Sequence, residues 1–408
     1  MFLLLLSIMK IKSNTHIIIA VTILLLLAII GVKYLIGSHA LKPFSSSKVT
    51  PSAYTVIGNK IIGPKGAFQP FGFVVYCLSE TSIDPSCAGS LSDTQKIQSA
   101  GTFWHANDVR IQAATELLYS NGSTVDSSYV AKLDAEVKLA NSLGMIAVVT
   151  QQTERAGTKS PAPDANSIKF WQYMSAHYAN NPKVFFDLFN EPRLKVADIS
   201  GGTEGSMWDI WRNGGTVTLT AGGTGTYVGM QTLFSTVRAN ANNIVIAEVT
   251  YGDKDTKLLA THLLNGSNLA YGYEANLYAP GSYARLVYPL GRSDTPAAWD
   301  ADFGNYSKTY PMMMEAFNDH PSGGCYANSN VVFPQLTSYL QANNLGMTFF
   351  TLESGLAVIG NNLQNPTTYP TSSSLIDCSA GAIDSTATIG NGRDLLNWYK
   401  SDPQNISQ

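Results

Sequence analysis

The chain has 408 residues, of which 45% are hydrophobic and only 13% are charged. The formal net charge is −3 and no long basic run is present, so the electrostatic footprint of a nucleic-acid-binding protein is missing. The apolar content supports a large core, either in one large domain or in about two or three ordinary ones.

Residues 17–37 form a nearly continuous apolar stretch that begins "IIIAVTILLLLAIIGV". The stretch is about the length needed to cross a bilayer and longer than the core of most signal peptides. We therefore expect residues 1–37 to be a basic segment followed by a transmembrane or signal-anchor helix. The alternative is a secreted protein cleaved after Ala40, because "SHA" has the small residues of a cleavage site.

Two further segments follow the apolar stretch. Residues 38–53 are rich in Ser, Pro and Thr and are typical of a linker. Residues 54–408 show no second shift of composition, so we expect a single extracytoplasmic domain there.

All four cysteines lie after the apolar stretch: Cys77, Cys87, Cys325 and Cys378. An even number fits two disulfides in an oxidising compartment, and no CxxC spacing indicates zinc. We predict the pairs Cys77–Cys87 and Cys325–Cys378, with four buried free thiols as the alternative.

Eight short apolar runs alternate with helix-like stretches along the folded part. The runs are 70–78, 108–113, 145–152, 184–191, 243–249, 269–277, 310–317 and 346–353. The helix-like stretches include 128–143, 167–180, 227–241, 331–342 and 392–400. Runs without strict alternation indicate strands covered on both faces, and eight such units predict an α/β fold, a (β/α)8 TIM barrel behind the N-terminal helix.

Chemistry in such barrels sits where the strands end, so the polar residues that close each run are candidates. They are Arg110, Gln112, Gln151, Gln152, Asn190, Glu191, Glu248, Asn276, Tyr278, Glu315 and Glu353. None of the six histidines closes a run, so neither a histidine triad nor an HExxH metal site is expected.

Two carboxyl groups on opposite sides of a scissile bond are the requirement for glycoside hydrolysis. Glu191 closes the fourth run and Glu315 the seventh, and these strand ends face each other across a barrel mouth. Glu353 is a rival for Glu315, and Glu191 has the alternative of a structural carboxylate paired with an arginine. We interpret Glu248 as a supporting residue rather than a catalytic one.

Three motifs carry a resemblance to a known family. "VFFDLFNEP" (184–192) resembles the Asn-Glu-Pro signature of glycoside hydrolase family 5, the retaining β-glycosidases of the cellulase family with a TIM barrel. "YPMMMEAF" (310–317) resembles its nucleophile strand, and "NDVRIQA" (107–113) its second-strand arginine motif. The similarity covers about residues 68–355.

The resemblance implies roles for the strand-end residues. Glu191 would be the general acid/base, with its pKa raised by the negative charge of Glu315, and Glu315 would be the nucleophile. Arg110 would orient Glu315, Tyr278 would donate to it, and Asn190 would bond the 2-hydroxyl of the sugar.

This chain also departs from the family. Gln152 and Asn276 stand where the family usually has histidines, and Phe350 stands where it usually has tryptophan. All three are expected to bind substrate. Trp208 and Trp211 lie in a Gly- and Thr-rich segment, 194–225, and are predicted either to stack on sugars or to pack within a loop.

The expected function is a retaining endo-β-glycosidase acting on β-1,4-linked glucan or mannan. The alternatives are an inactive or weak carbohydrate-binding protein on the same scaffold and an exo-acting glycosidase. We expect no metal or organic cofactor. The expected partners are a polysaccharide or oligosaccharide substrate and the membrane, and the chain is expected to be a monomer.

Overall fold

The structure, a computed structural model, describes residues 53–80, 91–120, 124–152, 160–250, 255–274, 295–317, 329–352, 357–367 and 391–401. Eight parallel strands form the central sheet: β4 (Phe71–Val75), β5 (Asp108–Ala114), β6 (Ile146–Gln152), β7 (Val184–Asp187), β10 (Val245–Glu248), β11 (Leu269–Tyr273), β12 (Met312–Met314) and β13 (Met347–Phe349). They are neighbours in chain order. Each coincides with one of the eight predicted runs, so the predicted barrel order is confirmed.

The sheet closes between its first and last strands. β13 pairs with β4 in parallel, with Met347 opposite Phe71. On its other side, the N–H of Phe317 donates to the carbonyl of Thr348 and the N–H of Phe350 donates to the carbonyl of Phe317, both at 2.7 Å. These bonds join the segment after β12 to β13 and complete the ring.

Side chains alternate between the inside and the outside of the barrel because strand residues point to opposite faces. Along β10, Ile246 belongs to a buried apolar cluster inside the barrel, and Glu248 follows two residues later. Along β7, Phe185 belongs to the same cluster and Asp187 follows. The barrel interior is thus apolar near the amino ends of the strands and charged near their carboxyl ends.

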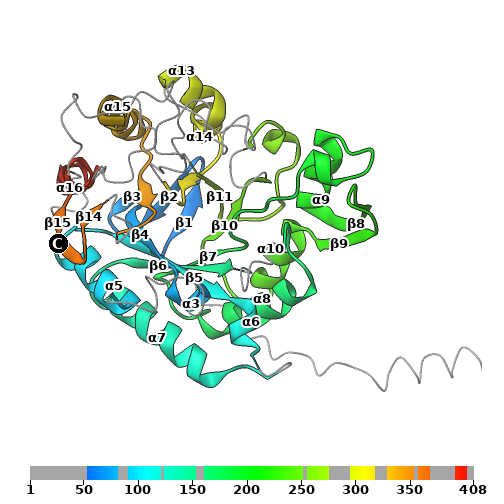
Figure 1. Cartoon of the computed structure of the whole chain (residues 1–408), viewed down its shortest axis with the longest axis horizontal. Helices are drawn as coiled ribbons and strands as arrows, with labels where there is room; N and C mark the ends of the chain where they lie inside the picture. The colour runs from blue at the N-terminus through cyan, green and yellow to red at the C-terminus, as the bar shows by residue number, and fades with distance from the viewer. Residues whose placement is uncertain are drawn as a thin grey trace, which may run out of the picture. The chain divides into compact units, whose positions relative to one another are not determined.

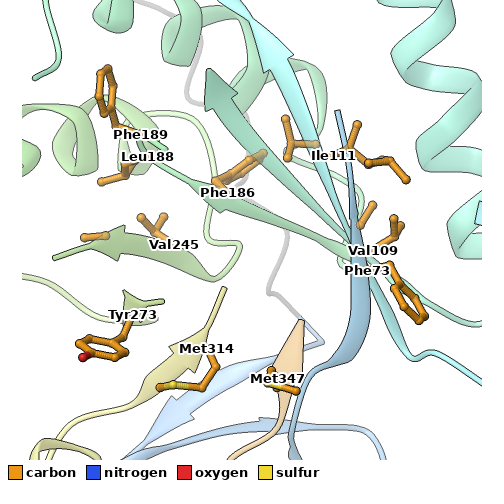
Figure 2. Close-up of a cluster of buried hydrophobic side chains, with 14 of the residues drawn as sticks. Phe73, Val109, Ile111, Phe186, Leu188, Phe189, Val245, Tyr273, Met314 and Met347 are labelled. Atoms are coloured by element: carbon orange, nitrogen blue, oxygen red, sulfur yellow. The ribbon is translucent and has the colours of Figure 1, made fainter. Parts of the chain in front are cut away.

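The outward side chains of the strands pack against the surrounding helices. Figure 2 shows Val109, Ile111, Phe186 and Val245 within this larger core. The longer helices are α5 (Asp93–Thr102), α7 (Ser127–Ser142), α8 (Ala165–His177), α10 (Met230–Arg238), α15 (Ser329–Ala342) and α16 (Gly392–Ser401). Figure 1 shows α5, α7 and α8 on the outside of the strands.

Helix α7 illustrates why these segments are helical. The Asp126 side chain accepts hydrogen bonds from the backbone N–H groups of Ser128 and Tyr129, which caps the first turn. Leu133, Val137 and Ala140 are buried along one face. Gly144, with a φ of 88°, then lets the chain leave the helix.

A three-stranded antiparallel sheet, which the sequence patterns did not predict, covers the barrel at the amino ends of its strands. It consists of β1 (Thr55–Ile57), β2 (Lys60–Gly63) and β3 (Gly66–Phe68). Ile61 packs into the apolar cluster inside the barrel. The Phe68 ring meets Phe185 edge to face at 5.6 Å. The amino ends of the strands are therefore closed, and the carboxyl ends hold the polar residues.

The segment after β7 is folded rather than the loop expected for residues 194–225. It contains η1 (Val196–Asp198), α9 (Glu204–Asn213), β8 (Gly214–Thr218) and β9 (Thr224–Val228). β8 and β9 pair as a hairpin. The predicted helix 227–241 begins only at Met230 because Tyr227 and Val228 belong to β9.

Shorter elements complete the described chain: α3 (Cys77–Glu80), α6 (Thr115–Leu118), η2 (Leu259–Thr261), α13 (Pro296–Trp299), η3 (Asp300–Gly304), α14 (Asn305–Ser307), β14 (Val358–Ile359) and β15 (Asn362–Pro366). No helix within the described ranges is long and apolar enough to cross a bilayer. The expected anchor at 17–37 lies outside those ranges. Cys77 is disulfide-bonded, but the other three cysteines also lie outside, so the pairing stays a prediction.

Candidate active site

Arg110 is the centre of a buried charge cluster inside the barrel. Its guanidinium donates to Asp187 Oδ2 from Nε at 3.0 Å and from Nη2 at 2.5 Å. Nη2 also contacts Glu248, and Nε lies 3.2 Å from Glu315 Oε2. Burial works against the charge, but the carboxylates of Glu248, Asp187 and Glu315 outweigh it and hold the pKa of Arg110 above its usual value. One permanent cation therefore meets three carboxyl groups.

Glu315 follows β12 and is fully buried. The contact with Arg110, which the family resemblance led us to expect, is present. Gly272 on the neighbouring strand β11 leaves the space that this carboxyl uses, because a Cβ at Gly272 would lie 3.0 Å from Glu315 Cγ. The contact and the tight space fix the carboxyl of Glu315 in one direction.

Glu191 lies just beyond β7 at the more open end of the cluster. Its side chain is 19% exposed, and its φ of 49° puts the backbone in the left-handed region. The backbone N–H of Glu191 donates to Glu248 Oε2 at 2.5 Å. Its carboxylate pairs with Arg193, so the arginine that binds Glu191 is a residue that the sequence patterns did not single out.

Asn190 is buried between two donors. Its Oδ1 accepts from Arg110 Nη2 at 2.9 Å and from Gln112 Nε2 at 3.2 Å. Because an arginine only donates, the amide oxygen must face it and the amide nitrogen must face elsewhere. Asn190 therefore has a donor directed away from Arg110, as the expected bond to a sugar hydroxyl requires.

The two glutamines that end β6 have different surroundings. Gln151 donates to Thr115 Oγ1 at 2.9 Å and to Ser167 Oγ at 2.8 Å, which ties the strand to α6 and α8. Gln152, the next residue, is buried and points to the opposite face of the strand. Of the pair, Gln152 is the one that lies on the barrel side.

Phe350 follows β13 and is half-buried. Its ring stacks on that of Tyr76, which follows β4, with centroids 5.6 Å apart and an angle of 26° between the planes. The stacked pair forms an aromatic edge at the carboxyl ends of β4 and β13. Tyr76 was not among the predicted site residues, although it lies within the first predicted run.

The prediction that Trp208 and Trp211 stack on sugars is wrong, because both side chains are buried in α9. Their rings pack on each other with centroids 5.0 Å apart. Trp211 Nε1 donates to the backbone carbonyl of Glu248 at 2.9 Å, so it supports the end of β10 from outside. The alternative is right that both residues pack, but they do so in a helix and not within a loop.

Two carboxyl residues near the strand ends were missed. Asp187 is the inward-facing last residue of β7, and it was hidden inside an apolar run. Glu274 directly follows β11 and is buried. The period-2 alternation along each strand, counted back from Glu191 or Asn276, was the signal that pointed to them. The predicted residues Asn276, Tyr278 and Glu353 lie outside the described part of the chain.

Asp108 lies two residues before Arg110 on the same face of β5. Burial raises its pKa from 3.8 to about 7, against the lowering effects of a hydrogen bond from Thr348 Oγ1 and of the charge of Arg110.

Among the described residues, no three His, Cys, Asp or Glu side chains are arranged to hold a metal ion. The described histidines lie elsewhere: His177 and His262, for example, pair with Asp134 and Asp209.

Comparison with known proteins gives a family match. The model of the family described as cellulase (glycosyl hydrolase family 5) matches residues 77–354. That range contains Arg110, Glu191 and Glu315. A search of curated proteins finds no match.

Solved structures share the fold. The β-glucanase SdGluc5_26A of Saccharophagus degradans has a TM-score of 0.57 at 18% identity, over 78% of this chain and 90% of its own. The catalytic domain of endoglucanase Cel5A of Thermobifida fusca has a TM-score of 0.55 at 14% identity, over 86% and 97%. The endocellulase of Pyrococcus horikoshii, in complex with cellotetraose, gives 0.54 at 14%, over 86% and 100%. At these identities the likeness concerns the fold.

Proposed function

Because the chain belongs to the cellulase family, glycosyl hydrolase family 5, we propose that this glycoside hydrolase is a retaining endo-β-1,4-glucanase. The observation that carries the proposal is the chain of three contacts that links the two expected catalytic carboxyls. Arg110 contacts Glu315, and Glu248 contacts both Arg110 and the backbone of Glu191.

In the proposed reaction, Glu315 attacks the anomeric carbon while Glu191 gives its proton to the leaving glycosidic oxygen. The products of this step are a shortened glucan and a glycosyl ester on Glu315. Glu191, now ionised, takes a proton from water, which attacks the anomeric carbon, breaks its bond to Glu315 and releases the sugar with its original anomeric configuration. Arg110 keeps Glu315 in its charged form and orientation.

The choice of glucan has two supports. Structures with this fold include proteins named as a β-glucanase and an endoglucanase, some of them bound to cellotetraose. The half-buried Phe350 ring, stacked on Tyr76, offers an apolar edge on which a glucose face packs. Mannan is the substrate that the assay must distinguish.

The test is release of reducing ends by the full chain from β-1,4-glucan, mannan and xylan. We expect turnover on glucan, and ¹H NMR of early products should show the β-anomer first. Glu191→Gln and Glu315→Gln should each abolish turnover in a chain that stays folded, as far-UV circular dichroism checks. Glu136→Gln, a buried glutamate of α7 outside the barrel, is the matched control. Full activity in either catalytic variant, or the α-anomer first, would overturn the proposal.

We also propose that residues 17–37 anchor the domain to a membrane, with the catalytic part outside the cytoplasm and Cys77–Cys87 and Cys325–Cys378 as the disulfides. The apolar length of that segment and the oxidised state of Cys77 support this. The chain should stay in the pellet after alkaline carbonate extraction and be released when residues 1–53 are deleted. Release of a shortened chain that begins after Ala40 would argue for cleavage there.

A further inference from the structure

Glu248 is a fully buried carboxyl at the end of β10, and its two oxygens accept from two different parts of the site. Oε2 accepts the backbone N–H of Glu191 at 2.5 Å, and Oε1 accepts Nη2 of Arg110. Arg110 in turn contacts Glu315 through Nε. One side chain therefore contacts both halves of the proposed catalytic pair.

The bond to Glu191 acts on an unfavourable piece of backbone. With a φ of 49°, Glu191 occupies the left-handed region, which a residue with a side chain adopts only when its surroundings hold it there. The preceding residue is fixed by a bond from its N–H to the carbonyl of Gln151 at 2.9 Å. Glu248 holds the next N–H. Together these bonds set the direction in which the Glu191 side chain leaves the chain.

Glu248 itself has little freedom to move. Trp211 Nε1 donates to its backbone carbonyl at 2.9 Å. Its side chain occupies the space over Gly272, where a Cβ would lie 2.8 Å from Glu248 Cγ. A side chain with a fixed backbone, a tight wall and a partner for each oxygen is a rigid support for its neighbours.

The charge of Glu248 also acts on the other groups near the strand ends. Those groups come from every neighbouring strand: Arg110, Asp187, Glu191, Glu274 and Glu315, with Arg193 next to Glu191. A negative charge beside Glu191 opposes loss of its proton, which a general acid must keep until the leaving group departs.

We propose that Glu248 is a positioning residue of this glycosidase: it holds the backbone of Glu191 in its reactive conformation and holds Arg110 against Glu315. The proposal rests on the roles proposed above for Glu191 and Glu315. Glu248 does not touch substrate; it acts through the two residues that it bonds.

The test compares Glu248→Gln and Glu248→Asp with the control Glu136→Gln. A glutamine has one acceptor oxygen, so it turns a donor toward either Arg110 or the Glu191 N–H. We expect Glu248→Gln to lower kcat about 10- to 100-fold with little change in KM. The alkaline limb of the kcat/KM profile should also move to lower pH, because a negative charge has gone. Glu248→Asp keeps the charge but loses the reach, so it should lower kcat and leave that limb in place.

Three outcomes would overturn the proposal. One is a Glu248→Gln variant with wild-type kcat. Another is a variant that loses only its folded fraction, with unchanged kcat per folded molecule and an unchanged pH limb. The third does not depend on activity: the Glu191 amide proton, labelled with ¹⁵N-glutamate, should resonate far downfield and move upfield in Glu248→Gln, and a resonance that is the same in both proteins would overturn the proposal. If the wild type turns over no substrate, the proposed function fails, and this resonance alone decides whether Glu248 positions Glu191.

Discussion

Arg193 forms an ion pair with Glu191, two residues earlier in the chain, at the open end of the charge cluster. The Arg193 side chain is 36% exposed and the Glu191 side chain 19% exposed. The backbone N–H of Arg193 donates to the carbonyl of Pro161 at 2.7 Å, which fixes its place. The expected general acid of the site thus has a cation beside it, whereas Glu315 shares its cation with two other carboxyls.

Replacing Arg193 by Gln should therefore change the pH dependence of the reaction. A neighbouring cation favours the ionised form of a carboxyl, so its removal lets Glu191 keep its proton to higher pH. We expect the alkaline limb of kcat/KM to rise by about one pH unit at low salt and by less at high salt, because the pair is partly exposed. The shift is opposite in sign to that expected for Glu248→Gln.

The control for this prediction is Arg212→Gln. The Arg212 guanidinium contacts the Leu263 carbonyl and the Asn213 side chain rather than a carboxylate. Arg212→Gln should leave the acid and the alkaline limb of the kcat/KM profile in place. An unchanged alkaline limb in Arg193→Gln would show that the ion pair does not govern Glu191 in solution.

Removing the central cation should make stability depend on pH. Arg110→Met leaves Asp187, Glu248 and Glu315 facing one another without a positive charge. Loss of one partner of a buried ion pair costs about 3–5 kcal/mol. We expect the free energy of unfolding to fall by about that amount at pH 8 and to recover partly at pH 5, as these carboxyls take up protons. Urea unfolding at both pH values measures it.

Arg238→Gln provides the comparison, since the Arg238 guanidinium contacts the backbone carbonyls of Ala241, Ser267 and Asn268. Its stability loss should be similar at both pH values. If Arg110→Met showed equal losses at pH 5 and pH 8, the three carboxyls would not be the source of the effect.

Asp108 should limit stability at neutral and alkaline pH. Its pKa rises from 3.8 to about 7 on folding, mainly through burial. The folded chain therefore binds more protons than the unfolded chain between these values, so stability falls as pH rises from about 4 to about 7 and then levels off. At about 1.4 kcal/mol for each pKa unit, the fall is on the order of 4 kcal/mol.

Asp108→Asn should reduce this slope, because an amide still accepts from Thr348 and does not ionise. It should be more stable than the wild type at pH 8 in urea unfolding. Asp126→Asn should change the pH dependence of stability in the opposite direction. Hydrogen bonds, first that from Ser128, lower the pKa of the Asp126 carboxyl to about 2. An Asp108→Asn slope equal to that of the wild type would contradict the prediction.

Phe350 is expected to contribute to substrate binding rather than to the chemical step. Phe350→Ala removes the ring that stacks on Tyr76 at the barrel mouth. Loss of one sugar-stacking contact should raise KM for cello-oligosaccharides about 5- to 10-fold, in line with about 1 kcal/mol for an aromatic contact, with kcat nearly unchanged. Phe103→Ala, a partly buried ring that packs against the outer core, should leave KM unchanged. A fall in kcat alone would place Phe350 in the chemistry instead.

The barrel could be predicted because its strands carry two signals in the sequence. An apolar run predicts the buried strand, and an abrupt polar residue such as Gln152 or Glu315 marks its end. Asp187 escaped because a single carboxyl inside "VFFDLF" looks like a break in a run, when it is the inward residue below Glu191. Its role depends on Arg110, which lies 77 positions away and meets it only in the folded barrel.

The structure of the segment after β7 was not predicted, for a different reason. Its many glycines and threonines suggested a loop, but Met207, Trp208 and Trp211 have the spacing of one buried helix face. The antiparallel sheet beneath the barrel was missed because its strands have only three or four residues each. Runs that short carry almost no periodic signal, and only their packing on the barrel cluster makes them regular.

Gly272 leaves the space that the side chains of Glu248 and Glu315 occupy. A Cβ there would lie 2.8 Å from Glu248 Cγ and 3.0 Å from Glu315 Cγ, so the space of one absent side chain is shared by both. Related chains that carry a carboxyl at the position of Glu248 should therefore carry glycine at that of Gly272, and those with alanine or larger should carry a shorter residue in place of Glu248. The two positions are expected to have changed together during the divergence of the family, so the residue at one should predict the size of the residue at the other.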